Sequence, residues 1–204
     1  QRPIGTELAM NLGAGALNGF IVALIASSIL PFLESMFDIT TNMRLLELSN
    51  MNHPALKELS VRAPGTYHHS IVVGNLAESA ADGISANALL VRVASYYHDL
   101  GKMLCPLYFV ENQNNRNYHD DLPARTSAQI IISHVKNGLE IAKRHRLGKA
   151  ICDILEQHHG SSLVRYFFHK AEQEQAELDT PPDEADFRYP GPKPRTKESA
   201  IIMI

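Results

Sequence analysis

The sequence predicts an all-α protein, a helical bundle preceded by one transmembrane helix. Three observations support this fold class. An uncharged apolar stretch near the start is long enough to cross a bilayer. Apolar residues after it recur at helical spacing, and no stretch alternates as a half-buried strand does. We expect a membrane segment at residues 1–38, a helical connector at 39–62 and the main domain at 63–204.

The membrane segment contains a continuous apolar run over residues 12–33, in which only Asn18, Ser27 and Ser28 are polar. As a helix this run is about 33 Å long, which matches the hydrocarbon core of a bilayer. A buried core helix and an uncleaved signal sequence are the alternatives. The signal sequence fits less well because only Arg2 is basic upstream. We therefore predict that residues 12–33 bind the membrane, although the flanking charges do not fix the orientation.

The remaining helices follow from apolar periodicity and from start and stop residues. Thr40 and Thr41 cap a short connector helix that runs to about Met51, and Pro54 suits the first turn of the next. In the main domain, helices are expected near 66–82, 86–98, 126–144, 148–159 and 161–176. A polar loop is expected over 106–123. A Pro-rich irregular excursion covers 177–195, and a new apolar run begins at Ala200.

Composition excludes several classes of function. The net charge of -3 and the isoelectric point near 6.4 provide no basic surface for a nucleic-acid duplex. The absence of Trp and an aromatic content of 7% do not favour a base-stacking platform. Cys105 and Cys152 are the only cysteines in the sequence, which indicates a reducing compartment rather than a disulfide framework.

Histidines lie on the apolar faces of consecutive predicted helices. Leu90, Ala94 and His98 share one face at four-residue spacing, and Asp99 follows at the end of that helix. The candidate metal ligands are His69, His98, Asp99, His134, His158 and His159. In a helical bundle such side chains converge in the interior, where metal sites are built from facing helices. The alternative is that the histidines are ordinary core residues with satisfied hydrogen bonds.

These residue types suit divalent metal ions. Neutral imidazole and carboxylate are good ligands for first-row metals, and the Asp99 carboxylate can bridge two ions. Two ions about 3.5–4 Å apart stabilise the attacking and leaving oxygens of a phosphoryl displacement. Lys102 lies one turn beyond Asp99, where its charge can bind a phosphate oxygen. We predict Asp99 and Lys102 as the catalytic residues.

The order of these residues, with their surroundings, resembles the HD-domain phosphohydrolases. An HD dipeptide alone is weak support, since His119-Asp120 is a second one in the polar loop. The specific matches are to the seven-transmembrane HD proteins, a group that includes the PgpH-type cyclic di-AMP phosphodiesterases. They are the sequences of residues 63–70, 96–102, 109–113, 130–135, 157–160 and 187–192.

The resemblance implies a domain on the cytoplasmic face of the cell membrane that hydrolyses cyclic di-AMP to pApA with iron or manganese. It implies that His69 and His98 bind one metal ion and that Asp99 bridges to a second. The ligands of the second ion would be His134, His158 and His159. Residues 12–33 would be the last membrane span. A non-catalytic nucleotide-binding sensor or scaffold on the same fold is the alternative function.

Neighbouring families fit less well. HD-GYP enzymes have a Gly-Tyr-Pro signature after the paired histidines, where this chain has Ser161 to Tyr166. The stringent-response hydrolases have an acidic pair after the HD dipeptide, where this chain has Gly101 and Lys102.

The sequence departs from the family pattern at one ligand. HD enzymes complete the first metal site with a late Asp on a helix. The late aspartates here, Asp179, Asp183 and Asp186, all lie in the Pro-rich excursion. The resemblance therefore implies a longer protein that provides this Asp just beyond Ile204, with its other membrane spans and an extracytoplasmic domain before residue 1.

Overall fold

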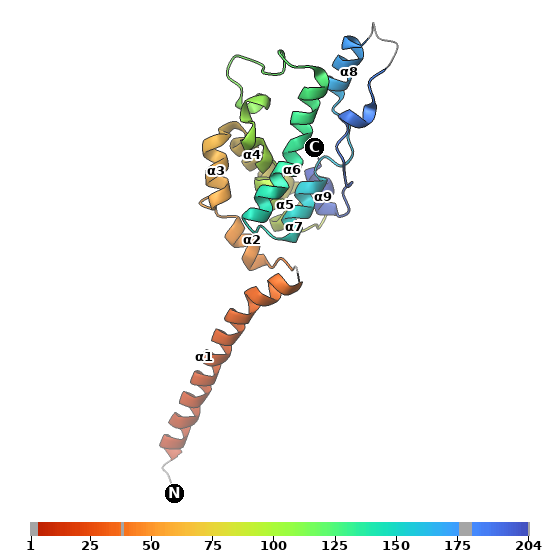
Figure 1. The fold of residues 1–204 in the computed structure, drawn as a ribbon. Coiled ribbons are helices and arrows are strands. Elements are labelled where there is room, and N and C mark those ends of the chain that lie inside the picture. Colours follow the sequence, from red (N-terminus) through yellow and green to blue (C-terminus); the bar gives the residue numbers. More distant parts are fainter. Residues whose placement is uncertain (1–3, 38, 176–180, 204) are drawn as a thin grey trace. The chain divides into compact units, whose positions relative to one another are not determined.

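The computed structural model describes residues 4–37, 39–175 and 181–203. It divides the chain into two compact units, Gln1–Thr41 and Asn42–Ile204 (Figure 1). Across the described ranges the regular elements are helices, and the β-structure there is one isolated bridge between Leu163 and Arg188. The predicted all-α fold class is confirmed.

The first unit contains a single long helix, α1 (Ile4–Phe37), which extends beyond the predicted run of 12–33 at both ends. Its segment Gly5–Glu34 has a mean hydropathy of 2.0 and is long and apolar enough to cross a membrane. The hydroxyls of Ser27 and Ser28 donate to the carbonyls of Ala23 and Leu24, each at 2.8 Å. These bonds reduce the polarity that two serines would expose in such a helix.

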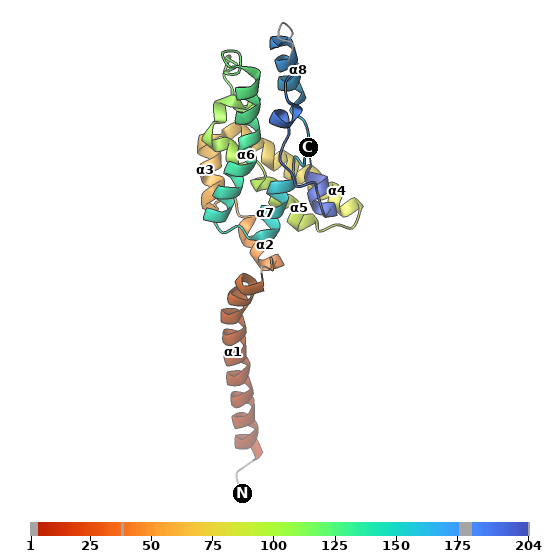
Figure 2. The ribbon, with the colours of Figure 1, turned by 45° about the vertical axis from the view of Figure 1, so that its right-hand side comes forward.

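The second unit is a bundle of short helices. Its α-helices are α2 (Asn42–Leu48), α3 (Pro54–Arg62), α4 (Pro64–Gly83), α5 (Ala88–Tyr97), α6 (Ala124–Arg144), α7 (Lys149–Gln157), α8 (Arg165–Glu174) and α9 (Lys197–Ile202). Its 3₁₀ helices are η1 (Leu100–Leu104), η2 (Pro106–Tyr108), η3 (Val110–Asn112) and η4 (Glu184–Phe187). In the view of Figure 2, α4 runs from beside α3 to the opposite side of the bundle, where it packs against α5.

Local interactions explain where several helices begin and end. The helix α2 stops at Leu48, before the predicted end near Met51, because the Asn50 side chain accepts a hydrogen bond from the Asn52 amide at 2.9 Å and forms a turn. At the start of α3, the side chain of His53 accepts from the Ala55 amide. At the start of α5, Asn87 accepts from the Leu90 amide at 3.0 Å.

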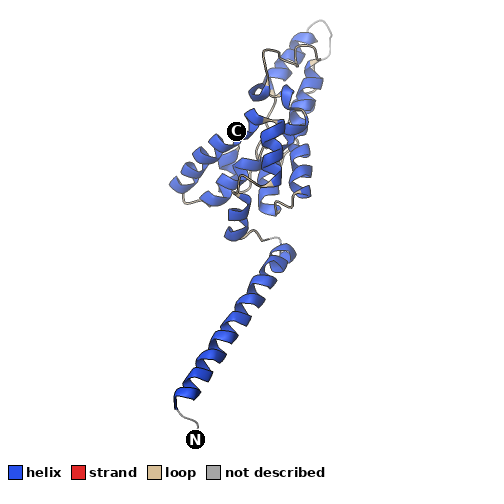
Figure 3. Cartoon of the chain, turned by 90° about the vertical axis from the view of Figure 1, so that its left-hand side faces the viewer, coloured by secondary structure: helices blue, strands red, loops and turns tan. Residues whose placement is uncertain are grey.

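Two segments differ from their predicted secondary structure. The predicted polar loop over 106–123 contains η2 and η3, because Phe109 is only 5% exposed and draws the chain against the bundle. The helix predicted over 161–176 begins at Arg165, since the preceding residues form the bridge to Arg188. The end of that expected helix, residue 176, lies outside the described residues. Figure 3 shows that the described residues form helices and the loops that join them.

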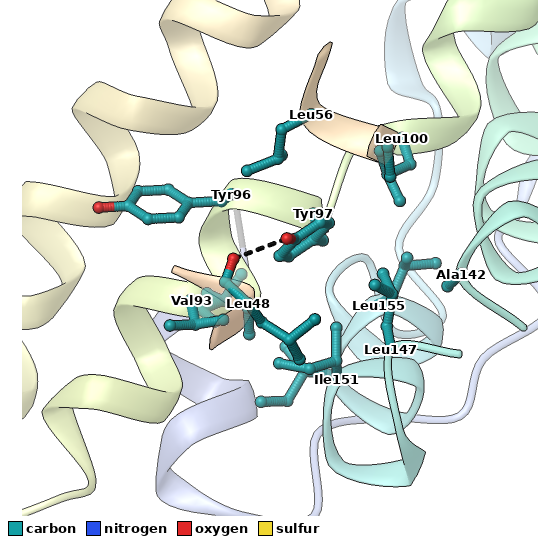
Figure 4. Packing of buried hydrophobic residues seen from close by; sticks show 14 of the residues in the cluster. Leu48, Leu56, Val93, Tyr96, Tyr97, Leu100, Ala142, Leu147, Ile151 and Leu155 are labelled. Carbon is teal, nitrogen blue, oxygen red and sulfur yellow. Dashed lines mark hydrogen bonds between the residues drawn. The ribbon is translucent and has the colours of Figure 1, made fainter. Parts of the chain in front are cut away.

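The main core is formed where η1 meets the helices α2, α3, α4, α5, α6, α7 and α9. Tyr97 is fully buried at its centre, and its hydroxyl donates to the carbonyl of Leu48 at 2.7 Å (Figure 4). Leu56, Leu100 and Ile151 are also 0% exposed, and each fully buried side chain of this size contributes roughly 1.5–3 kcal/mol. Because Tyr97 and Leu100 flank the His98-Asp99 pair, this core fixes the pair in the interior.

A smaller second core joins α8 and η4 to the start of α6. Its buried residues are Ala124, Ala128, Phe167, Ala171 and Phe187. The backbone of this region is held by hydrogen bonds from the Val164 amide to the Phe187 carbonyl at 2.8 Å and from the Tyr189 amide to the Ser162 carbonyl at 3.0 Å. The part of the expected irregular excursion that follows Thr180 therefore packs against the bundle.

Candidate metal centre

The HD pair lies at the turn between α5 and η1. His98 is the C-cap of α5, and Asp99 follows with φ -106° and ψ 18°. Immediately after it, Gly101 lies against the backbone of α6. A Cβ atom on Gly101 would be 1.8 Å from the carbonyl oxygen of His134. This close approach, which only glycine permits, places Asp99 beside the His134 side chain.

The structure brings all six predicted ligands together around Asp99. They form two groups that share this residue, His69–His98–Asp99 and Asp99–His134–His158–His159, with ligand atoms within 4.8 Å of one another in each group. Asp99 Oδ2 faces the first group, with His98 Nε2 at 3.1 Å and His69 Nε2 at 3.8 Å. Asp99 Oδ1 faces the second, with His134 Nε2 at 3.4 Å and His158 Nε2 at 3.7 Å.

Three of the histidines are oriented in the same way. Their Nδ1 atoms contact the backbone carbonyl three residues earlier: His98 to Ser95 at 2.7 Å, His134 to Ile131 at 2.5 Å and His158 to Leu155 at 2.6 Å. A carbonyl oxygen can only accept, so Nδ1 must carry the hydrogen. In the neutral ring this leaves Nε2 with a free lone pair that points toward Asp99, as a metal ligand requires.

The arrangement fits divalent cations better than it fits a metal-free core. His134 Nε2 and His158 Nε2 lie 3.1 Å apart, so that two lone pairs would face each other at close range. Asp99 Oδ1 is buried and has no hydrogen-bond donor in the described part of the chain. A buried carboxylate oxygen without a partner is unfavourable. A cation among these nitrogen and oxygen donors would resolve both conflicts.

The protonation of the site also suits metal binding. Burial by itself would raise the pKa of Asp99, but the charges of His98 and Lys102 outweigh it and hold this pKa well below its ordinary value. Burial is the largest influence on His134 and lowers its pKa to about 4, against the opposing charge of Asp99. At neutral pH Asp99 is therefore ionised and His134 is neutral, which are the forms that bind metal. The pKa of His98 is raised instead, because the charge of Asp99 outweighs the effect of burial.

Lys102 contacts the centre together with a residue that the sequence analysis did not single out. Its ammonium lies 2.8 Å from Asp99 Oδ2 and 2.9 Å from Glu111 Oε1. Glu111 also accepts a hydrogen bond from the Thr66 hydroxyl at 2.9 Å. The matching stretch 109–113 contained Glu111, but a loop residue has no helical periodicity from which its partner could be inferred.

Tyr189 is a second contact that periodicity did not reveal. Its ring stacks on His159, with centroids 4.2 Å apart and planes 18° apart, and it is only 8% exposed. The matching stretch 187–192 was the only signal in the sequence that pointed to this residue.

Other polar residues considered in the sequence have structural contacts instead. The buried His119 of the second HD dipeptide contacts the Tyr108 carbonyl at 2.8 Å and packs on the Phe167 ring. His68 is exposed. Of the late aspartates, Asp183 accepts from the Ala185 amide and Asp186 pairs with Arg125 at 2.9 Å. Asp179 lies outside the described residues.

Comparison with known proteins identifies the class. The HD domain family matches residues 66–204, which is more than half of the chain. The chain belongs to the HD-domain family.

Its relatives include proteins with an assigned activity. The cyclic-di-AMP phosphodiesterase PgpH of Bacillus subtilis (strain 168) is 46% identical over 201 residues, 98% of this chain and 28% of that protein. PgpH of Listeria monocytogenes is 51% identical over 198 residues, 96% of this chain and 27% of that protein. The chain thus spans little more than a quarter of the length of these relatives.

A solved structure is also similar. The HD domain of L. monocytogenes PgpH in complex with cyclic-di-AMP superposes with a TM-score of 0.70 and 53% sequence identity, covering 76% of this chain and 71% of that one. A second structure of that domain gives a TM-score of 0.69 and 54% identity, over 74% of this chain and 70% of that one.

Proposed function

We propose that this protein hydrolyses cyclic di-AMP to the linear dinucleotide pApA at a centre of two divalent metal ions. The observation that carries the proposal is the buried Asp99 carboxylate, whose two oxygens each face a separate group of histidines. The activity and substrate named for the PgpH relatives support the choice of reaction. When bound, two such ions would neutralise phosphate charge and lower the pKa of a water between them.

In this proposal the protein side chains have distinct roles. His69 and His98 hold one ion, and His134, His158 and His159 hold the other, with Asp99 shared between them. Lys102 provides a positive charge for a phosphate oxygen. The side chain of His69 is 38% exposed, against 3% for Asp99. Substrate therefore approaches from the His69 side of the centre.

We also propose iron or manganese as the physiological metal, because imidazole and carboxylate ligands suit both ions. In the same proposal, α1 crosses the cell membrane as the last span of a seven-transmembrane protein, with the HD domain in the cytoplasm. The length and hydropathy of α1 support the membrane span.

The test uses the 204-residue chain beside a version extended beyond Ile204 to include the Asp that the family resemblance implies. Both are purified in detergent, stripped with a chelator and reloaded with Mn²⁺ or Fe²⁺. Conversion of cyclic di-AMP to pApA is followed by chromatography, with cyclic di-GMP and a linear phosphodiester as competing substrates. Asp99→Asn is the test variant, since it keeps the size of the side chain but removes its charge. We expect Asp99→Asn to reduce turnover by ~10³-fold or more, because a shared anion is lost from the centre.

Three results would overturn parts of the proposal. Tight binding of cyclic di-AMP without turnover would favour the non-catalytic sensor. Faster hydrolysis of another substrate would change the substrate assignment. Equal activity of the wild type and Asp99→Asn would refute the two-metal assignment.

A further inference from the structure

Lys102 and a metal ion would need the same carboxylate oxygen. The Lys102 ammonium lies 2.8 Å from Asp99 Oδ2, which is the oxygen that faces His98 and His69. By contrast, Asp99 Oδ1 on the other side has no hydrogen-bond donor among the described residues. The two halves of the centre therefore differ. An ion entering the His69–His98 half meets a protein cation already bound to its shared ligand.

Glu111 provides a second anion for that cation. Its Oε1 lies 2.9 Å from the Lys102 ammonium, and the two side chains are 23% and 15% exposed. The Phe109 ring lies 5.0 Å from the same ammonium. If the Lys102 ammonium left Asp99 Oδ2, it would still pair with the Glu111 carboxylate and would not need to be hydrated. Its charge would stay at the more exposed side of the centre.

Glu111 is itself fixed to the helix that carries His69. Its Oε1 accepts from the hydroxyl of Thr66, in the first turn of α4. The neighbouring Asn112 accepts from the Gly65 amide at 2.9 Å and donates to the Thr66 hydroxyl at 2.8 Å. A Cβ on Gly65 would be 1.8 Å from the Glu111 carbonyl oxygen, so the two segments are in direct contact. The Glu111 carboxylate and His69 therefore belong to one rigid unit.

We infer that Glu111 is a positioning residue that receives the Lys102 ammonium from Asp99 when a divalent ion enters the His69–His98 half of the centre. In this arrangement Glu111 lowers the competition between Lys102 and the ion for Asp99 Oδ2. It also holds the Lys102 charge where an anionic substrate arrives. The inference deepens the proposed function and depends on it for the role of Lys102 toward substrate, but the cation exchange can be tested by metal binding alone.

The experiment is a Mn²⁺ titration of the chelator-stripped full chain in detergent, with free Mn²⁺ measured by electron paramagnetic resonance. His69→Asn and His159→Ala identify which binding class belongs to each half of the centre. We expect Glu111→Gln to weaken binding in the His69–His98 half by ~10–100-fold, in the range found for outer-shell partners of metal ligands. Binding in the other half should change by less than about threefold.

Two further variants separate this role from a general effect of charge. Lys102→Met should tighten binding in the His69–His98 half, because it removes the competing cation. In the Lys102→Met background, Glu111→Gln should then change the affinity by less than about threefold, since coupled residues are non-additive. Glu78→Gln is the matched control. Glu78 pairs with Arg92 at 2.8 Å and is 30% exposed, so this variant removes one similarly exposed acid away from the centre.

Wild-type Mn²⁺ affinity in Glu111→Gln, or an equal loss in the Lys102→Met background, would overturn the inference. If Glu111→Gln fails to fold, the Lys102→Met variant alone tests the inference. Weaker Mn²⁺ binding of Lys102→Met in the His69–His98 half would then overturn the inference. A wild-type protein extended beyond Ile204 that binds two Mn²⁺ ions but hydrolyses no cyclic dinucleotide would refute the proposed function and leave the cation exchange intact.

Discussion

Gly101→Ala is the substitution with the most direct geometric consequence for the centre. The new Cβ would lie 1.8 Å from the His134 carbonyl oxygen and 2.6 Å from the Gly138 amide nitrogen. Both are backbone atoms of α6, so no change of side-chain rotamer relieves the overlap. To reach an ordinary contact of 3.4 Å, η1 and α6 must separate by about 1.6 Å.

This separation affects both stability and metal binding. Overpacking of a tight interface typically destabilises a protein by about 1–3 kcal/mol, which corresponds to roughly 2–12 °C in melting temperature for a domain of this size. Because Asp99 is two residues from Gly101, the carboxylate would also move away from His134. A displacement of about 1 Å at a catalytic centre can reduce activity by roughly 10²-fold.

Thermal unfolding followed by circular dichroism and Mn²⁺ titration measure the two effects. Gly138→Ala should have a smaller effect at the same contact. Its Cβ would lie 3.1 Å from the Gly101 amide nitrogen, so the two segments need to move apart by only a few tenths of an ångström. Gly83→Ala is the neutral control because nothing lies within 4 Å of its Cβ position. A Gly101→Ala protein with the melting temperature and Mn²⁺ affinity of the wild type would refute the reasoning.

Three other predictions concern the histidines. Tyr189→Leu should lower the Mn²⁺ affinity of the His134–His158–His159 half by ~10-fold or more, because it removes the aromatic ring that stacks on His159 and orients it. Tyr189→Phe keeps the ring and should bind Mn²⁺ as the wild type does. Removal of metal with a chelator should lower the melting temperature, because ions that bind only the folded chain stabilise it; an unchanged value would argue against a metal centre. In the metal-free protein, stability should fall as the pH drops from 6.5 toward about 4. In this range the unfolded chain takes up a proton at His134 that the folded chain does not. Burial likewise lowers the pKa of His158 and adds to this loss of stability. The charge of Asp99 raises the pKa of His98 although His98 is buried, and this change stabilises the folded chain at low pH and so reduces the loss. Melting curves at pH 7 and pH 5 that coincide would contradict this sign.

The sequence could indicate the candidate centre because its ligands lie on or next to regular helices. Helical periodicity assigns His134 to the buried face of α6, and the same argument brings His98 to the interior end of α5. The helix ends were less well predicted. His158 is the C-cap of α7 rather than part of it, and Gly160 continues the turn with φ +52°. Periodicity alone does not distinguish a last helical residue from a cap.

Glu111 and Tyr189 could not be derived from periodicity because they reach the centre from irregular segments. A loop residue is placed by the contacts of its neighbours, which for Glu111 are the hydrogen bonds of Asn112 to the start of α4. Tyr189 is placed in the same way by the backbone bond from its amide to Ser162. In both cases the decisive partner is distant in sequence, so only the folded chain reveals the pairing.

These two irregular segments contribute to the asymmetry around Asp99. The segment that carries Glu111 lies beside Asp99 Oδ2, and the Lys102 ammonium contacts both Glu111 and that oxygen. On the other side, the segment that carries Tyr189 covers His159 with an uncharged ring, and Oδ1 is left without a donor. Electrostatic attraction for an incoming cation is therefore stronger on the Oδ1 side, where no protein cation competes for the carboxylate. The two halves already differ in their ligands, with two histidines against three, and the two irregular segments add a difference in the groups that surround them.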